Sequence, residues 1–228
     1  WGEPVNLGST VNSSAFDVKM NISTDGLSLI FDSDRSGGYG GHDLWVSTRP
    51  TLSDSWGTPV NLGSTVNSSG WDYAPALSTD GLSLFFSSTR PGGYGGWDDL
   101  WLTRRDTTND PWGEPVNLGP EVNSSSGEAG PSISVDGSTL YFGSNRPGGS
   151  GGVDLWQVSI LPVVDFNGDG KVDTDDLLIL IDNWGINEPL CDIGPTPFGD
   201  GIVDMKDLEV FMSYWEKENI PEIPEEEL

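Results

Sequence analysis

Short apolar runs alternate with polar turns along most of the chain, and no helical spacing occurs before residue 173. Residues 83–88 read SLFFSS, a compact run of the kind that forms a β-strand. The pair Asp25-Gly26 separates two such runs, and Asp-Gly in this setting is a hairpin signal. The pattern therefore predicts short antiparallel strands joined by tight turns.

This pattern repeats three times. WGEPVNLGSTVNSS begins at residue 1, WGTPVNLGSTVNSS at residue 56 and WGEPVNLGPEVNSS at residue 112, so the offsets are 55 and 56 residues. Each copy continues with an S-x-D-G turn, a glycine-rich R-x-G-G-x-G-G segment and a D-L-W run. Each unit therefore predicts four short strands, the fourth being the PVNLG run after the next WG pair.

The repeats resemble the TolB-type, WD-repeat-like β-propeller family over residues 1–160. The resemblance implies a mostly β fold, a partial or oligomer-completed β-propeller over residues 1–161, with four-stranded blades at about 1–55, 56–111 and 112–161. The first PVNLG run is expected to complete the last blade. Known propellers have ~4–8 blades. Missing upstream blades, a six-bladed ring of two chains and an open arc are therefore the alternatives. Because the chain opens inside a repeat, we expect it to be a piece of something longer.

Polar residues that recur in every repeat are expected to be structural. An arginine precedes each glycine segment and an aspartate precedes each Leu-Trp, so an Arg–Asp pair is predicted to brace the glycine loop. A ligand-gripping arginine triad, as in sialidase-like propellers, is the alternative. The aspartate of each S-x-D-G turn is predicted to accept backbone N–H groups. These residues are Arg35, Arg90 and Arg146; Asp43, Asp99 and Asp154; and Asp25, Asp80 and Asp136.

The aromatic residues divide into repeated and unrepeated ones. The tryptophans of the D-L-W runs are expected in the blade cores and those of the WG pairs between blades. Aromatic residues that break the repeat or lie in glycine loops are candidates for stacking on a sugar or peptide. The three groups are Trp45, Trp101 and Trp156; Trp1, Trp56 and Trp112; and Tyr39, Trp71, Tyr94 and Trp97.

No catalytic residue is predicted. His42, the one histidine, is interpreted as incidental, and no acid stands out from its repeat partners. There is no Ser-His-Asp set, H-E-x-x-H or Walker-type loop in the sequence. Paired carboxylates for glycoside hydrolysis are set by space rather than by sequence spacing, so that chemistry stays open.

Charge distinguishes the end of the chain from the rest. The formal net charge is −26; 18 acids and 7 bases precede residue 165, and 18 acids and 3 bases follow. Such a surface repels nucleic acid and anionic lipid, and it suits divalent cations. Cys191 is the one cysteine, which excludes an intrachain disulfide, and no apolar run approaches ~18 residues, so no membrane span is expected.

Residues 165–176, DFNGDGKVDTDD, have the ligand spacing of an EF-hand loop. Counted from Asp165, oxygen-bearing side chains fall at positions 1, 3, 5, 9 and 12, with glycine at 6 and a backbone carbonyl ligand at 7. A hard cation wanting ~6–8 oxygens offsets the repulsion among these carboxylates. The predicted Ca²⁺ ligands are Asp165, Asn167, Asp169, Lys171 through its carbonyl, Asp173 and Asp176.

One helix follows this loop and aspartate occupies position 12, so the segment resembles a dockerin type I module, over residues 162–217. A second half, FGDGIVDMKDLEVFMSYW, repeats DGKVDTDDLLILIDNW. In its loop Phe198 falls at position 3 and cannot ligate, while Asp192 is placed to take position 1 through a longer loop. The second loop is therefore either a modified calcium site, with Asp192, Asp200, Asp204 and Asp207, or a loop held by packing.

The dockerin resemblance implies a secreted, extracellular or cell-surface protein whose Ca²⁺-ordered helices dock onto a cohesin-like domain. Residues 218–228 form an acidic tail. Three functions stay open: a non-catalytic propeller that binds a glycan or protein and is tethered through this module, a carbohydrate-active hydrolase completed by upstream blades, and a structural surface-assembly protein.

Overall fold

The computed structural model describes residues 1–160, 164–167, 171–186, 188, 191–194, 199 and 201–218. The predicted ligands Asp169 and Asp200, and residues 219–228 of the predicted tail, lie outside them. The chain divides into two compact units, Trp1–Ser159 and Ile160–Leu228. Each unit is described by itself below.

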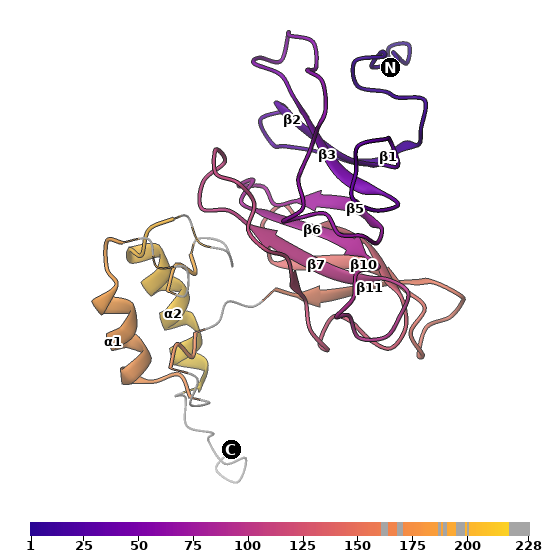
Figure 1. The fold of residues 1–228 in the computed structure, drawn as a ribbon. Helices are drawn as coiled ribbons and strands as arrows, with labels where there is room; N and C mark the ends of the chain where they lie inside the picture. Colours follow the sequence, from indigo (N-terminus) through magenta and orange to yellow (C-terminus); the bar gives the residue numbers. More distant parts are fainter. Residues whose placement is uncertain are drawn as a thin grey trace. The chain divides into compact units, whose positions relative to one another are not determined.

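The first unit consists of three antiparallel sheets, coloured from indigo to orange in Figure 1. Their strand orders are β1-β2-β3-β4, β5-β6-β7-β8 and β11-β10-β9. The strands are β1 (Asp17–Ile22), β2 (Ser28–Ser33), β3 (Asp43–Thr48), β4 (Val60–Asn61), β5 (Asp72–Leu77), β6 (Ser83–Ser88), β7 (Asp99–Arg104), β8 (Val116–Asn117), β9 (Glu128–Ile133), β10 (Thr139–Ser144) and β11 (Asp154–Ser159). The prediction of a mostly β unit built from short strands is confirmed.

The hairpin turns form as their aspartates predict. Asp25 Oδ1 accepts the Leu27 N–H at 2.9 Å, and Asp80 and Asp136 make the same bond in the other two sheets. The fourth strand of a sheet comes from the following repeat, since Val60 of β4 pairs with Val46 of β3. The first and second sheets are therefore each closed by a segment that lies beyond the next WG pair.

The three sheets stack in sequence order. The first strands of successive sheets, β1, β5 and β9, lie next to one another, and β5 also contacts β2 and β3. Ile30 and Leu44 of the first sheet share one core cluster with Leu84, Phe86 and Trp101 of the second. This arrangement is consistent with three blades of a partial β-propeller.

The third sheet differs from the predicted four-stranded blade. It has three strands among the described residues, and residues 4–8, the first PVNLG run, form no strand. The expected closure of the last blade by this run is therefore not found. The first and third sheets contact the second one on either side, which keeps residues 4–8 away from β11.

The tryptophans follow the prediction only in part. Trp45 and Trp101 are buried in the sheets, whereas Trp156 is half-buried. Trp56 and Trp112 each pack against a core cluster, but Trp1 is fully exposed rather than packed between blades. The repeat thus sets each residue's position, while its burial depends on whether a neighbouring sheet is present.

Among its described residues, the second unit has two helices, α1 (Thr174–Asp182) and α2 (Met205–Glu218), as the sequence predicts (Figure 1). Leu180 of α1 and Phe211 of α2 are fully buried in one core with Cys191. Burial raises the pKa of the Cys191 thiol to about 11, with a further contribution from Glu188, so the thiol stays protonated at neutral pH. Neither helix is long and apolar enough to cross a membrane.

Candidate functional site

A repeated hydrogen-bond network holds each sheet of the first unit, and it corrects one prediction. The arginines pair with the acid that begins the first strand of their own sheet, not with the aspartate before Leu-Trp. Arg90 Nη2 lies 2.6 Å from Asp72 Oδ1, and Arg146 lies 3.1 Å from Glu128. Arg35 pairs with Asp17 in the same way. The arginines therefore belong to the scaffold, which disfavours the ligand-gripping triad.

The aspartates before Leu-Trp brace the glycine loops without the arginines. Asp43 Oδ2 accepts the Tyr39 N–H at 2.6 Å and the Asn61 amide at 2.9 Å. Asp99 and Asp154 accept the equivalent loop N–H groups in the other sheets. These loops are thus fixed structures that can present side chains.

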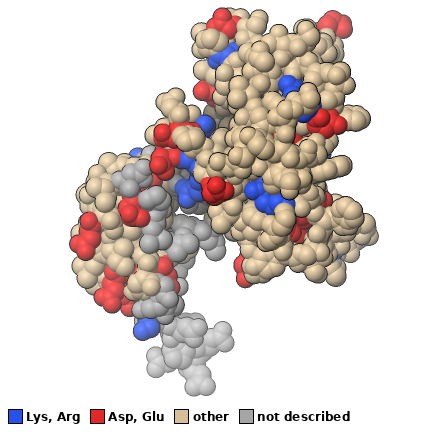
Figure 2. All heavy atoms as spheres, viewed as in Figure 1, with Lys and Arg blue, Asp and Glu red and all other residues tan. Residues whose placement is uncertain are grey.

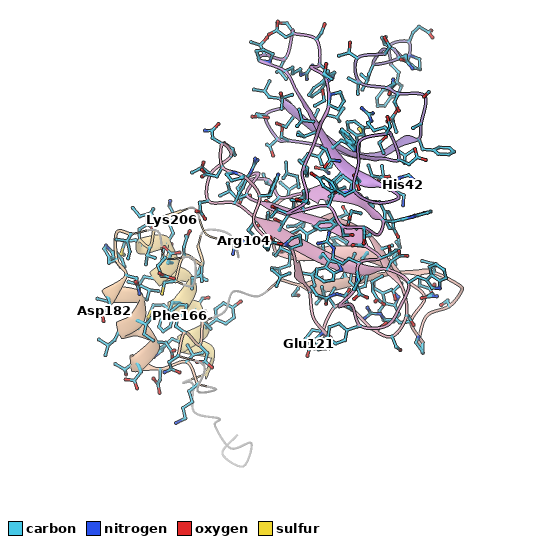
Figure 3. The ribbon with its side chains drawn as sticks, in the orientation of Figure 1. His42, Arg104, Glu121, Phe166, Asp182 and Lys206 are labelled. Atoms are coloured by element: carbon cyan, nitrogen blue, oxygen red, sulfur yellow. The ribbon has the colours of Figure 1, made fainter. Side chains whose placement is uncertain are left out.

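A pocket of about 540 Å³ is lined by residues of the first two sheets. Val18 and Lys19 come from β1, Asp32 from β2 and Tyr73 from β5. Loop residues complete the wall: His42, which Figure 3 labels, and Trp71, Thr89, Trp97 and Asp98. Two of the four candidate aromatic residues, Trp71 and Trp97, therefore share one pocket, while Tyr39 and Tyr94 lie outside its lining.

Asp32 and His42 form a pair at this pocket. His42 Nδ1 lies 2.8 Å from Asp32 Oδ2, and Asp32 Oδ1 accepts the Ala74 N–H at 2.9 Å. The Asp32 side chain is 1% exposed and that of His42 is 17% exposed. Burial raises the pKa of Asp32, and the bonds from Ala74 and His42 offset part of that rise. The interpretation of His42 as incidental does not account for this pair.

Tyr73 and Lys19 also line this pocket. Burial, followed by a hydrogen bond to Asp98, raises the pKa of Tyr73, so the phenol stays protonated. Lys19 Nζ lies 4.2 Å from the centre of the Tyr73 ring. The Trp71 ring lies 5.2 Å from that of His42, and more than half of its surface is exposed. The pocket therefore combines exposed indoles with hydrogen-bonding groups of both polarities.

The residues of this pocket depart from the repeat. Asp32 occupies the position of Ser87 and Gly143, and His42 that of Asp98 and Val153. The expectation that no acid stands out from its repeat partners is therefore wrong for Asp32. The signal was present in the aligned segments FDSDR, FSSTR and FGSNR.

Lys19 departs from the repeat in the same way. It stands at a bulge where the other sheets have Ala74 and Gly130, and all three have a left-handed backbone, with φ of +42°, +52° and +66°. A long charged side chain is unusual in that conformation, which favours glycine. Trp71 likewise replaces Phe16 and Gly127, and Trp97 belongs to a one-residue insertion.

In the second unit, two predicted Ca²⁺ ligands occupy equivalent positions. The Asp176 carboxylate is buried and accepts the N–H groups of Phe166, Asn167 and Asp173 at 2.8, 3.2 and 3.0 Å. The Asp207 carboxylate is also buried. It accepts those of Ile193, Gly194 and Asp204 at 2.6, 2.7 and 2.7 Å.

These matching bonds align Asp192 with Asp165, because each precedes the first of the three donors. The longer second loop thus places Asp192 at the position equivalent to Asp165, and the Gly201 N–H bonds it at 2.7 Å. Asp173 caps α1 by accepting the Asp175 N–H. Asp165 is half-buried, whereas Asn167 and Lys171 are exposed.

The oxygen donors of both loops suit a hard cation such as Ca²⁺. Among the residues that the structure describes, which omit Asp169 and Asp200, no group of three His, Cys, Asp or Glu is gathered at metal-binding distance. Acidic side chains lie at several places on the surface of this helical unit (Figure 2).

The chain is thus a mostly β protein with stacked antiparallel sheets and a small helical unit. No family model and no curated protein matches it. Solved structures similar to it include TolB from Acinetobacter baumannii, 16% identical with a TM-score of 0.41 over 62% of this chain and 29% of that one. A putative TolB from Agrobacterium tumefaciens is 20% identical, with a TM-score of 0.43 over 62% and 42%.

A thermostable family-43 glycoside hydrolase is 17% identical, with a TM-score of 0.38 over 63% of this chain and 53% of that one. The chain therefore spans less than two thirds of the length of each of these proteins. Their activities are not carried over to it.

Proposed function

We propose that the chain is a non-catalytic binding protein whose pocket takes a carbohydrate and whose helical unit tethers it through Ca²⁺. One observation carries the proposal of carbohydrate binding: the pocket lies where several residues differ from their equivalents in an otherwise regular repeat. Scaffold residues such as Arg90 and Asp99 recur in all three sheets, while Asp32, His42 and Trp71 do not. Because these three residues come together at one pocket, we interpret their departure from the repeat as an adaptation to a ligand.

The charges of the pocket favour a neutral ligand. Asp32 and Asp98 oppose an anion, and Lys19 supplies a cation that already lies over the Tyr73 ring. A cationic ligand would have to displace Lys19 or lie beside it. A neutral ligand with many hydroxyl groups avoids both costs, because each hydroxyl both donates and accepts.

A pyranose ring also matches the walls of the pocket. Its C–H faces are apolar and planar enough to lie on the exposed indoles of Trp71 and Trp97. Its hydroxyls find acceptors on Asp98 and donors on Lys19 and His42. The proposed ligand class is therefore a neutral glycan or oligosaccharide.

Binding is tested by calorimetric titration with a panel of neutral oligosaccharides. Trp71→Ala and Trp97→Ala should each weaken the bound sugar about 10-fold or more, because each removes an apolar platform. Trp1→Ala is the matched control, since Trp1 is exposed outside the pocket. Unchanged affinity in both pocket variants would reject the site.

Hydrolysis of the glycan is the second candidate, and Asp32 favours it. A carboxyl group whose pKa is raised by burial is what a general acid requires. Release of reducing ends from the same panel, abolished by Asp32→Asn with binding retained, would replace the binding role with a hydrolase.

The tether rests on the repeated architecture of the helical unit. Two loops end in Asp176 and Asp207, which make the same three backbone bonds and lead into helices that share one core. Loop 1 would hold Ca²⁺ through Asp165, Asn167, Asp169, Lys171 carbonyl, Asp173 and Asp176, and loop 2 through Asp192, Asp200, Asp204 and Asp207. The ion would supply charge that keeps these carboxylates together.

This arrangement supports a dockerin-like role, in which the ordered helices attach an extracellular protein to a cohesin-like partner. Extracellular calcium suits such a site, because weak sites fill there. Surface plasmon resonance against immobilised cohesin domains, with Ca²⁺ and then with EDTA, tests the role. Calcium-dependent binding is expected; calcium uptake without any cohesin binding would keep the metal site and remove the partner.

A further inference from the structure

The two ends of the sheet stack carry complementary surfaces. Ile30 and Leu44 of the first sheet point into the core shared with the second, with 2% and 0% of their surface exposed. Phe85 and Leu100, the same positions in the second sheet, are 2% and 0% exposed. In the third sheet these positions are Tyr141 and Leu155, which are 44% and 91% exposed. The third sheet therefore presents an uncovered version of a face that is buried twice elsewhere.

The opposite end of the stack has a matching groove. A hollow of about 290 Å³ on the first sheet is lined by residues of β1, β2 and the segment before them. Six of them are apolar, Leu7, Val11, Val18, Met20, Leu29 and Phe31, and three are polar, Asn12, Asp17 and Lys19. For four of the six apolar positions, the repeat places Leu62, Val66, Leu84 and Phe86 in the second sheet, whereas Tyr73 and Pro75 stand for Val18 and Met20. There the hollow is filled, because Ile30 and Leu44 of the first sheet pack into it.

The contact between the first and second sheets thus shows which kind of surface fills such a groove. Tyr141 and Leu155 are the repeat equivalents of the residues that fill the same hollow on the second sheet. We infer that the third sheet of one copy packs into the groove on the first sheet of a second copy. Two copies would then bury both ends of both stacks.

This contact is head to tail, so its geometry decides the size of the assembly. Two copies contribute six sheets, a number within the ~4–8 blades that close into rings. Closure uses the same contact twice and covers the groove and the third-sheet face of both copies. Each copy has a net charge of −26, so the assembly should be stronger when salt screens the repulsion.

Sedimentation velocity on the whole chain in 0.15 and 0.5 M NaCl tests the proposal. A species of about 49 kDa, twice the 24.5 kDa of one chain, is expected, with more of it in high salt. Leu155→Glu and Met20→Glu should each give a 24.5 kDa species, because the charge must be buried at both contacts of the ring. Val60→Glu on β4 is the matched control, since Val60 is 64% exposed, does not line the groove and does not belong to the third sheet.

When the Leu155→Glu and Met20→Glu variants are mixed, a dimer of one copy of each retains one unaltered contact. We expect the dissociation constant of this mixed dimer to be about 10–100-fold higher than that of the unaltered chain. A wild-type chain that stays monomeric at 100 μM would overturn the proposal and leave the faces to another segment or partner. Larger open polymers would overturn ring closure, and a dimer unaffected by both substitutions would place the contact elsewhere.

Discussion

At the scale of single residues, the same position can serve the scaffold in one sheet and a pocket in another. Asp32 Oδ1 accepts the Ala74 N–H at the bulge of the next sheet, and Ser87 Oγ accepts the Gly130 N–H in the same way. A serine hydroxyl therefore satisfies the bulge without any charge. The charge of the Asp32 carboxylate is therefore not required for this bond. Its second oxygen, Oδ2, is hydrogen-bonded to His42.

Asp32→Asn should change how stability depends on pH. Since burial raises the pKa of Asp32, folding disfavours its charged form, and this cost grows as the pH rises from the usual value of 3.8 through the raised pKa. The variant has no such cost. The unfolding free energy of the variant minus that of the wild type should therefore increase over this pH range and then level off.

Urea denaturation between pH 3 and pH 7 measures this difference. Ser87→Ala is a control for loss of the bulge bond without a change of charge, and it should give a pH-independent loss of about 0.5–1.5 kcal/mol. A wild-type advantage that grows with pH would show that His42 stabilises the charged form more than burial opposes it.

The repeated arginines, Arg35, Arg90 and Arg146, show which contacts between residues the sequence could predict. An Arg–acid pair in every repeat was predicted correctly, but the acid was wrong. The register of the first hairpin explains why: Asp17 lies opposite Ser33, which brings its carboxylate to the arginine two residues further along. Spacing along the chain does not reveal which acid a strand pairing will bring near.

Arg90→Ala should strongly destabilise the first unit. Arg90 pairs with Asp72, whose side chain is fully buried, and it also donates to the Val66 carbonyl at 2.5 Å. Its loss leaves a buried carboxylate without its countercharge, at a cost of about 3–5 kcal/mol in unfolding free energy. Arg104→Ala, at an exposed arginine of β7, should cost less than about 1 kcal/mol. Equal effects in chemical denaturation would show that the Arg90 pair is not special.

At the scale of elements, each helix of the second unit depends on an acid that precedes or begins it. Asp173 and Asp176 form a capping box on α1, and Asp204 and Asp207 make the equivalent bonds before α2. Capping and proposed metal binding therefore use the same carboxylates. The sequence predicted the two helices because their apolar spacing is local. It left the second loop open because Phe198 falls at position 3, where its side chain cannot ligate, although Asp192 was already placed at position 1.

Asp176→Ala separates these two roles. Without Ca²⁺ it should lower the stability of the helical unit by about 0.5–2 kcal/mol, because backbone N–H groups lose their acceptor. It should also abolish the added stability that Ca²⁺ gives. Asp175→Ala, at an exposed neighbour whose carboxylate is not a predicted ligand, is the matched control. Helix content is followed by circular dichroism with and without Ca²⁺; a variant still stabilised by Ca²⁺ would remove Asp176 from the ligand set.

At the scale of the whole molecule, repetition made the sheets predictable and concealed the pocket. Three copies of one pattern established the strands, the turns and their order. Reading the copies as equivalent directed attention away from the positions at which they differ, such as Asp32 and Lys19. The sequence also could not predict whether residues 4–8 complete the third sheet. Whether these residues form a strand depends on which sheet lies beside them and not on their own sequence.

The two units should respond differently to the removal of calcium. The second has 18 acids and 3 bases in the last 64 residues, so its self-repulsion is high and a bound cation lowers it. At a free Ca²⁺ concentration about 100 times the dissociation constant, binding adds about 2.7 kcal/mol to the stability of a unit that binds one ion only when folded. The first unit has hydrophobic cores and no predicted Ca²⁺ ligand, so Ca²⁺ should not change its stability. Differential scanning calorimetry should therefore show two transitions, of which EDTA lowers only that of the helical unit. Half-molar NaCl with EDTA is the control for charge screening alone. Asp176→Ala should lower the midpoint of the same transition that EDTA lowers, which assigns that transition to the helical unit. If NaCl in the presence of EDTA restored the full midpoint temperature, charge screening, and not a bound ion, would order the helices.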